Sequence, residues 1–105
     1  MERVLEGVKV LEVSAWAFVP SAGAVLADWG AEVVKVEPPE GDPMRGLISG
    51  GVGGGPSFPW EVWNRGKHSI GVDLRTPGGR DVVLGLAEQA DVFLTSYLPS
   101  TRGKL

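Results

Sequence analysis

The chain has 105 residues, enough for at most one small domain, and its 43% hydrophobic content suits a packed core rather than a disordered segment. Ten basic and thirteen acidic residues give a net charge of -3, and no basic stripe dominates, which excludes a general nucleic-acid binder. The chain has no cysteine and one histidine, which excludes disulfides, thiolate metal sites and a multi-histidine metal site within it.

The N-terminal stretch predicts neither a signal peptide nor a membrane anchor. Residues 1–6 carry acidic side chains where a signal peptide needs basic ones before an apolar run. No stretch approaches the roughly 18 consecutive apolar residues of a membrane span. We therefore expect a cytoplasmic protein with no membrane contact.

The first third of the chain predicts a strand, a helix and a second strand. Residues 8–13 are largely apolar and β-branched, as in a buried strand, and residues 31–37 repeat this pattern. Between them, Pro20 suits the first turn of a helix and Gly30 suits the position just after its end. The apolar residues Ala22, Val25, Leu26 and Trp29 repeat at helical spacing. Such a βαβ unit has a right-handed crossover and parallel strands.

The rest of the chain continues the alternation after an irregular segment rich in glycine and proline, residues 38–57. A short helix over 58–65, a third strand over 69–74, a helix that begins after Thr76 and a fourth strand over 91–95 follow in that order. Residues 96–105 carry no strong pattern. The order predicts one α/β domain over residues 1–105: a Rossmann-like parallel sheet of about four strands with helices on both faces, fewer strands than a finished sheet needs.

The glycine cluster between residues 50 and 55 predicts a loop or lid rather than a nucleotide-binding turn. A dinucleotide fingerprint follows a strand directly and opens a helix, whereas this cluster comes well after the second strand and is followed by Pro56. The first turn between strand and helix, residues 14–20, has no glycine. An ordinary NAD domain is therefore a disfavoured alternative.

Basic side chains near predicted strand and helix ends are candidate anion ligands. They are Arg65, Lys67, Arg75 and Lys104. Each alone is an ordinary surface charge, but at the carboxyl edge of a parallel sheet they would form a pocket for a pyrophosphate or a 3′-phosphate. Asp73 lies near the end of the third strand, where either a ligand contact or an ion pair with Arg75 is expected.

Two other groups of residues have competing interpretations. We expect His68, the one histidine, to be a solvated or helix-end residue rather than a catalyst. Four aromatic residues either stack on an adenine or, as we favour, belong to the core or a subunit interface: Trp16, Phe18, Trp60 and Trp63. No G-x-S-x-G motif marks a nucleophilic serine.

Three stretches of the chain resemble the class III CoA-transferases, the family of formyl-CoA transferase, carnitine CoA-transferase and α-methylacyl-CoA racemase. The first comprises residues 5–13 and 26–43 and includes Glu37-Pro38-Pro39-Glu40-Gly41-Asp42-Pro43. The second comprises residues 64–70 and 72–80, and the third is Ala90-Asp91-Val92 followed by Pro99. The resemblance covers practically the whole chain in the right order and spacing.

The resemblance implies a function. In that family the N-terminal Rossmann-like part holds the nucleotide of coenzyme A, and a catalytic aspartate lies further along than any residue present here. In the transferases the aspartate attacks an acyl-CoA thioester to give a mixed anhydride. CoA thiolate then forms an aspartyl-CoA thioester, and an incoming carboxylate takes over the CoA. In the racemase branch, acid–base residues move the proton α to the thioester. The subunits are several times longer and form interlocked homodimers, so the sheet here is incomplete relative to the family fold.

The resemblance also implies contacts with coenzyme A or acyl-CoA, with no catalytic residue and no metal in the chain. The matching positions are Trp16, Ala17, Val72, Asp73, Leu74, Arg75, Ser96 and Lys104. Where the family has Ala-Gly-Pro the chain has Phe18-Val19-Pro20, and Ala17 lacks an amide that some transferases carry. The usual Glu-Asn-Phe is Thr95-Ser96-Tyr97, so an asparagine contact is replaced by a serine hydroxyl.

We therefore expect the N-terminal CoA-binding part of a class III CoA-transferase, acting on acyl-CoA and carboxylate substrates and inactive as an isolated chain. The alternatives are racemase-like proton transfer and a non-catalytic truncated or split fragment. Such a fragment would need a complementary chain, because the edge after the fourth strand would be exposed.

Overall fold

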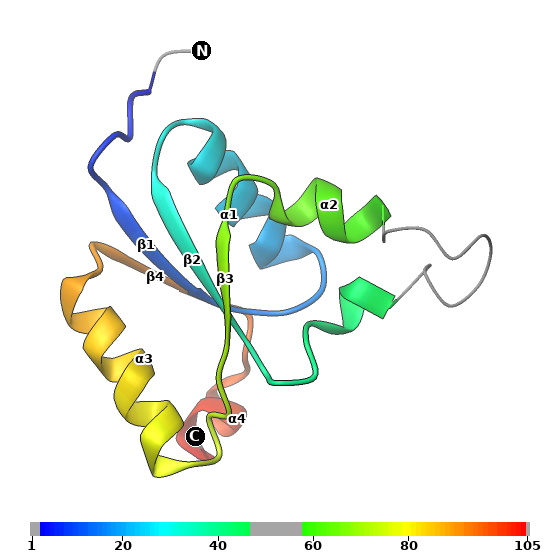
Figure 1. The fold of residues 1–105 in the computed structure, drawn as a ribbon, viewed down its shortest axis with the longest axis vertical. Helices are drawn as coiled ribbons and strands as arrows, with labels where there is room; N and C mark the ends of the chain where they lie inside the picture. The colour runs from blue at the N-terminus through cyan, green and yellow to red at the C-terminus, as the bar shows by residue number, and fades with distance from the viewer. Residues whose placement is uncertain (1–2, 47–57, 105) are drawn as a thin grey trace.

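The computed structural model describes residues 3–46 and 58–104, which form one sheet with helices packed against it (Figure 1). In chain order the elements are β1 (Lys9–Val13), α1 (Phe18–Asp28), β2 (Glu32–Glu37), the 3-10 helix η1 (Pro43–Gly46), α2 (Phe58–Asn64), β3 (His68–Gly71), α3 (Pro77–Gln89), β4 (Val92–Thr95) and α4 (Pro99–Lys104).

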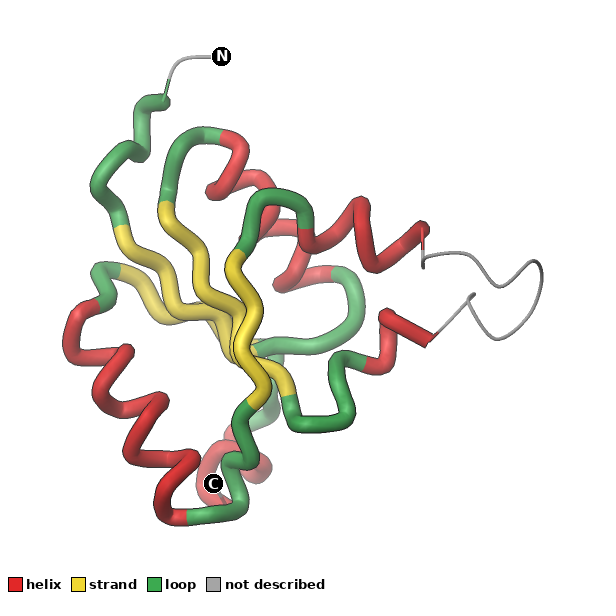
Figure 2. Tube along the Cα trace, viewed as in Figure 1, coloured by secondary structure: helices red, strands yellow, loops and turns green. Residues whose placement is uncertain are grey.

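The four strands are parallel and lie in the order β3-β2-β1-β4. Helices α1 and α2 lie on one face of the sheet and α3 lies on the other, as the red tubes on either side of the yellow strands show (Figure 2). This arrangement follows from right-handed crossovers, because the chain first moves from β1 towards β3 and then returns past β1 to β4. The predicted α/β fold with helices on both faces is confirmed.

Local signals explain where the helices begin and end. The Thr76 hydroxyl accepts a hydrogen bond from the Gly79 N–H at 3.0 Å and Pro77 occupies the first turn, so α3 begins as predicted. Helix α1 begins at Phe18, before the expected Pro20, and ends ahead of Gly30, whose φ of 104° favours glycine.

Two short helices were not predicted from the sequence. Helix α4 has Pro99 at its start but no buried residue, so it lacks the apolar period by which longer helices are found. The 3-10 helix η1 lies in the segment interpreted as a loop, where the Asp42 carboxylate accepts a hydrogen bond from the Met44 N–H at 2.9 Å. Both are too short for periodicity to be visible.

The sheet buries different side chains on its two faces. On the face under α3, Leu11, Val13 and Val36 form an apolar core, which side chains of α3 and β3 extend. On the face under α1, Val10, Ala31 and Val33 form a second apolar core. Because side chains alternate along a strand, the next positions on the α1 face are Glu12 and Lys35, and both are fully buried. None of the described helices is long and apolar enough to cross a membrane.

Candidate functional site

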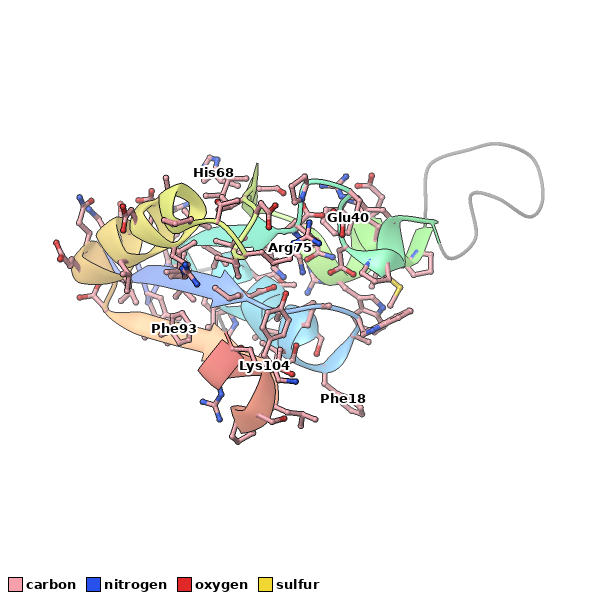
Figure 3. The ribbon with its side chains drawn as sticks, turned by 90° about the horizontal axis from the view of Figure 1, so that it is seen from below. Phe18, Glu40, His68, Arg75, Phe93 and Lys104 are labelled. Atoms are coloured by element: carbon pink, nitrogen blue, oxygen red, sulfur yellow. The ribbon has the colours of Figure 1, made fainter. Side chains whose placement is uncertain are left out.

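The carboxyl edge of the sheet has a switch point between β1 and β4. The connection after β1 leads to α1 on one face, whereas β4 is reached through α3 on the opposite face. In open parallel sheets, ligands bind outside the carboxyl ends of the strands at such a point. Figure 3 looks onto this edge, with Arg75 and Lys104 labelled on different elements around it. Lys104 is exposed, on α4.

The turn after β1 lies directly at the switch point and is held from both sides. The Ala15 N–H donates to Ser96 Oγ at 3.1 Å, and the Trp16 N–H donates to Asp42 Oδ1 at 3.3 Å. Trp16 has a φ of 70°, in the left-handed region that a non-glycine residue rarely adopts. The structure therefore places Ser96 beside the turn that contains Trp16 and Ala17, where the Ser96 oxygen holds the turn through the Ala15 N–H.

A second turn, residues 72–75, follows β3 at the same edge. Arg75 Nε lies 3.0 Å from Asp73 Oδ1, so the ion pair expected as one alternative for Asp73 is present. The Arg75 hydrogen bond lowers the pKa of the Asp73 carboxyl below its ordinary 3.8. The Arg75 side chain remains 78% exposed, so its guanidinium can still meet an anion from solution.

The turn at residues 72–75 lines an open hollow of about 200 Å³. The apolar part of its lining comes from Val36, Pro38, Pro39, Val72, Leu74 and Tyr97, and its carboxylates are Glu37, Glu40 and Asp73. Burial raises the pKa of Tyr97, and nearby Asp42 and Glu40 raise it further. Carboxylates repel an anion, so within this hollow only Arg75, which also lines it, favours an anionic group, and the rest of the lining suits a flat ring and hydroxyl groups.

A buried charge network beneath α1, which sequence reasoning missed, adjoins the site. Glu12 and Lys35 are direct partners in the register of β1 and β2, with Lys35 Nζ 3.1 Å from Glu12 Oε2. Lys35 Nζ also lies 2.9 Å from Asp42 Oδ2, and Lys67 Nζ lies 2.7 Å from Glu12 Oε1. The Ser14 hydroxyl donates to Glu12 Oε2 at 2.6 Å. The available signal was a charge between apolar neighbours inside each strand, Glu12 in β1 and Lys35 in β2.

The predicted cluster of four cations at the carboxyl edge is wrong for two of its members. Arg65 Nη2 pairs with Asp28 Oδ2 at 2.6 Å, and only 1% of the Lys67 side chain is exposed. Lys67 also donates to the Pro20 carbonyl at 2.8 Å, and burial lowers the pKa of its ammonium below 10.5. Both residues precede β3, so their backbone lies at the amino end of that strand, whereas Arg75 follows β3 and lies at its carboxyl end.

Glu37, the last residue of β2, has its carboxylate occupied within the chain. Arg45 Nε and Nη2 donate to its two oxygens at 2.7 and 2.8 Å, and the Ser69 hydroxyl and the Asp42 N–H donate as well. Burial raises the pKa of Glu37, but these hydrogen bonds outweigh it and lower the pKa from 4.5 to about 2. An acid near this place binds the ribose of NAD in dinucleotide-binding domains, so its occupation by Arg45 argues further against the NAD alternative.

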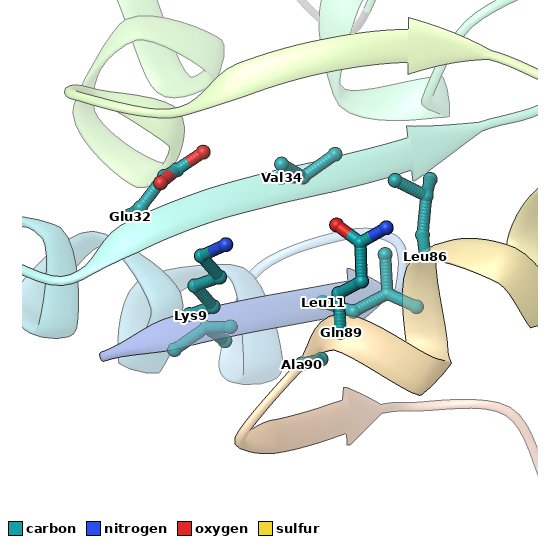
Figure 4. A pocket seen from close by; sticks show the side chains of 8 residues that line it. Lys9, Leu11, Glu32, Val34, Leu86, Gln89 and Ala90 are labelled. Carbon is teal, nitrogen blue, oxygen red and sulfur yellow. The ribbon is translucent and has the colours of Figure 1, made fainter. Parts of the chain in front are cut away.

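A smaller hollow lies at the amino end of the sheet, between the last turn of α3 and the starts of β1 and β2 (Figure 4). Its volume is about 70 Å³, with Lys9 and Glu32 at the strand starts and Leu86, Gln89 and Ala90 from α3. Pockets for drug-sized ligands have about 300–1,000 Å³. Both hollows lie below this range, but the one at residues 72–75 is nearly three times larger and lies at the carboxyl ends of the strands, where open parallel sheets bind ligands.

The remaining candidates have separate positions. His68 is exposed, in keeping with a solvated residue. Trp60 is half-buried under the Arg45 guanidinium, 3.6 Å from its ring centre, while Phe18 is 93% exposed, so the aromatic residues do not form one adenine floor. The glycine cluster lies outside the described residues. Within residues 3–46 and 58–104, no group of three or more metal-ligating side chains is present.

Comparison with known proteins identifies the family. The model of CoA-transferase family III matches residues 5–105. Succinyl-CoA–D-citramalate CoA-transferase of Chloroflexus aurantiacus is 45% identical over 100 residues, which are 94% of this chain and 25% of that protein. From the same organism, 2-methylfumaryl-CoA isomerase is 34% identical over 103 residues, 92% of this chain and 25% of that protein.

A solved structure supports the same assignment. The crystal structure of a CAIB/BAIF family protein from Brucella suis superposes with a TM-score of 0.89 at 37% identity, covering 99% of this chain and 28% of that one. The chain thus spans about a quarter of the length of the relatives it matches. It belongs to CoA-transferase family III.

Proposed function

We propose that this member of CoA-transferase family III binds coenzyme A and acyl-CoA at the carboxyl edge of its sheet, as the N-terminal CoA-binding part of a transferase. The contacts come from the turn after β1, the turn after β3 and the residues after β4. They are Trp16, Ala17, Val72, Asp73, Leu74, Arg75, Ser96 and Lys104.

One observation carries the proposal. The residues that resemble the family's CoA-contacting stretch, Val72–Arg75, line a hollow at the carboxyl edge. Tyr97 lines the same hollow and directly follows Ser96, whose hydroxyl holds the turn at the switch point. The hollow and the switch point are therefore neighbours through residues 96 and 97, which suits a long ligand lying along the edge.

The chemistry of the edge orients such a ligand. We place the adenine and ribose in the hollow, where apolar side chains supply packing and the exposed Glu40 carboxylate accepts hydrogen bonds from hydroxyl or amino groups. The phosphates lie towards the exposed Arg75 and Lys104. The thiol arm then runs past the end of β1 to the Trp16 turn.

The proposed reaction moves CoA between an acyl-CoA and a carboxylic acid through an aspartyl-CoA intermediate. We assign no catalytic acid among the 105 residues, and we place the active protein in the cytoplasm as an interlocked homodimer or in complex with a complementary chain. Purified 105-residue chain mixed with acyl-CoA and a carboxylate acceptor is expected to give no CoA exchange. Turnover would refute this assignment.

A matched pair of arginine variants tests the binding site. Arg75 and Arg65 are both partly exposed and each pairs with one aspartate, but only Arg75 lies at the proposed site. We expect Arg75→Ala to weaken CoA binding about 10–100-fold in isothermal titration, the effect of a lost hydrogen bond to a charged group. Arg65→Ala should leave the affinity unchanged, and equal effects of the two variants would refute the site.

Two further ligands sharpen the same titration. Dephospho-CoA lacks the 3′-phosphate, so Arg75→Ala should have a much smaller effect on it if Arg75 meets that phosphate, and the full effect if Arg75 meets the pyrophosphate. NADH should bind at least tenfold more weakly than CoA, because the Glu37 carboxylate is held by Arg45. Tighter binding of NADH would favour the NAD alternative.

Proton transfer α to a thioester is the second candidate reaction, because a CoA-ester isomerase is among the similar proteins. Transferase and isomerase relatives match the same region, so both reactions are compatible with the CoA site proposed here. Exchange of the α-proton with deuterated solvent, measured on an acyl-CoA with the catalytic assembly, separates them. Exchange without a carboxylate acceptor favours the isomerase-like reaction.

A non-catalytic fragment that needs a partner chain is the third candidate. In the described part of the chain, β4 lies at one edge of the sheet, and an open apolar hollow of about 310 Å³ adjoins it. Phe93 lines this hollow and is 52% exposed, and Leu84 is 62% exposed. We expect concentration-dependent association by analytical ultracentrifugation, abolished by Phe93→Glu. A monomer at all concentrations would count against this candidate.

A further inference from the structure

The Trp16 turn is held in a conformation that its own sequence does not favour. Among the described residues, Trp16 is the one non-glycine residue with a positive φ, and its side chain is 52% exposed. A half-exposed ring makes few packing contacts that could impose this backbone. Strained backbone persists only where its surroundings determine it, and it gathers at ligand sites.

The two side chains that hold the turn are distant from it in sequence: one follows β4 and the other follows β2. Ser96 Oγ accepts from the Ala15 N–H at 3.1 Å, on the β4 side. Asp42 Oδ1 accepts from the Trp16 N–H at 3.3 Å, on the β2 side. Consecutive N–H groups are thus directed to opposite sides, which fixes the peptide between them.

The Asp42 carboxylate is itself fixed. It is 2% exposed, and its Oδ2 atom lies 2.9 Å from Lys35 Nζ. The Asp42 N–H donates to Glu37 Oε1 at 2.8 Å, and Asp42 Oδ1 also accepts from the Met44 N–H at 2.9 Å. Burial leaves Asp42 no direct contact with a ligand in solution.

Capping of η1 does not account for this arrangement. A helix cap needs one acceptor oxygen, and a neutral serine or asparagine supplies it as well as an aspartate does. A fully buried carboxylate is costly unless it is paired, and here a second atom of the same group pairs with a buried lysine. The negative charge of Asp42 pairs with the buried Lys35 ammonium. The second hydrogen bond that Asp42 Oδ1 accepts, from the Trp16 N–H, holds the Trp16 turn.

We propose that Asp42, oriented by Lys35, is a positioning residue for the thiol arm of coenzyme A: it fixes the Trp16–Ala17 turn over which that arm passes. This inference rests on the proposed CoA site, and it assigns the nucleotide end of the ligand to the separate Val72–Arg75 turn. The Asp42 side chain is therefore expected to affect binding of the thiol arm much more than binding of the nucleotide.

The test compares two ligands and two matched variants of the purified protein. Adenosine 3′,5′-bisphosphate carries the nucleotide of coenzyme A but lacks its thiol arm. Asp42→Asn keeps the shape and an acceptor oxygen but turns an amide towards the Lys35 ammonium. Asp28→Asn makes the same change at the surface pair with Arg65. Titration calorimetry measures both affinities, and circular dichroism reports the folded fraction.

We expect Asp42→Asn to weaken CoA binding at least tenfold and bisphosphate binding less than threefold, with no change for Asp28→Asn. Equal weakening of both ligands, or an unchanged CoA affinity, would overturn the positioning role. A wild-type protein that binds neither ligand would instead refute the proposed CoA site.

If Asp42→Asn does not fold, Ser96→Ala tests whether the fixed turn, rather than Asp42 itself, serves the thiol arm, and the direct CoA contact proposed for Ser96 acts in the same direction. Ser96 is exposed, so its loss removes the acceptor on the other side of the turn without opening the core. The same selective pattern is expected at roughly threefold for CoA. Loss of bisphosphate binding to the same degree would contradict the proposal.

Discussion

The two faces of the sheet are built from different chemistry. Under α3 the strands bury Leu11, Val13 and Val36 against apolar side chains, while under α1 the carboxyl half of the same strands buries Glu12 and Lys35. The apolar face gains free energy from burial, which has no preferred direction. The charged face holds particular atoms at particular distances, and it does so next to the candidate site.

Stability alone does not explain the charged face. Replacement of a buried ion pair by well-packed apolar side chains is often neutral or stabilising, whereas loss of one partner is strongly destabilising. The network reaches Asp42 and through it the Trp16 turn. We conclude that the α3 face serves chiefly to hold the fold, and the α1 face to place the turn.

The largest expected effect is on the charged face. Lys35→Met leaves the carboxylates of Glu12 and Asp42 buried without the cation between them. We expect a loss of about 3–5 kcal/mol in the free energy of unfolding, measured by urea denaturation. Lys9→Met, at the exposed start of β1, should change it by less than about 0.5 kcal/mol. Equal losses of unfolding free energy for Lys35→Met and Lys9→Met would show that the buried network stabilises the fold no more than an ordinary surface charge does.

Glycines on the two faces should respond to alanine with opposite signs. A Cβ at Gly23 in α1 would overlap Glu12 Oε1, whereas a Cβ at Gly85 in α3 meets nothing within 4 Å. We expect Gly23→Ala to destabilise by about 1–3 kcal/mol and Gly85→Ala to stabilise by about 0.5–1 kcal/mol, by the same denaturation assay. A Gly23→Ala variant as stable as wild type or more stable would show that α1 is free to move off the charged layer.

The smallest effect is a pH dependence at the rim of the charged face, where Arg45 is 45% exposed and its pairing is screened by solvent. The pKa of Glu37 is lowered from 4.5 to about 2, so its ionised form stabilises the fold above pH 4.5, and this contribution is lost as the pH falls towards 2. Glu37→Gln should therefore be less stable than wild type at neutral pH, with the difference vanishing near pH 2. A difference that does not change with pH would contradict the ion pair.

The sequence predicts the elements that repeat an apolar period and misses those that do not. The strands and the three longer helices follow from alternation, caps and prolines, while the exposed α4 and the single-turn η1 carry no such signal. The two turns of the site were predicted from the family resemblance. The Glu12–Lys35 pair was not, because it depends on strand register, which a single sequence does not reveal.

The Arg65 and Lys67 prediction shows a second limit. The cations were near a strand end in the sequence, but a strand has two ends, and only residues after a parallel strand reach the carboxyl edge. Lys67 moreover has a long side chain that reaches back beneath α1 to Glu12. Closeness to a strand in the sequence therefore did not predict at which end of the sheet each basic side chain lies.

Amide chemical-shift mapping with coenzyme A tests the location of the site most directly. In a two-dimensional nitrogen–proton spectrum of the labelled protein, the shifts that change on CoA addition are expected to gather at residues 71–75, at residues 15–17 and at Ser96. Changes gathered at the opposite edge, around Lys9, Glu32 and Gln89, or no changes at millimolar CoA, would contradict the account.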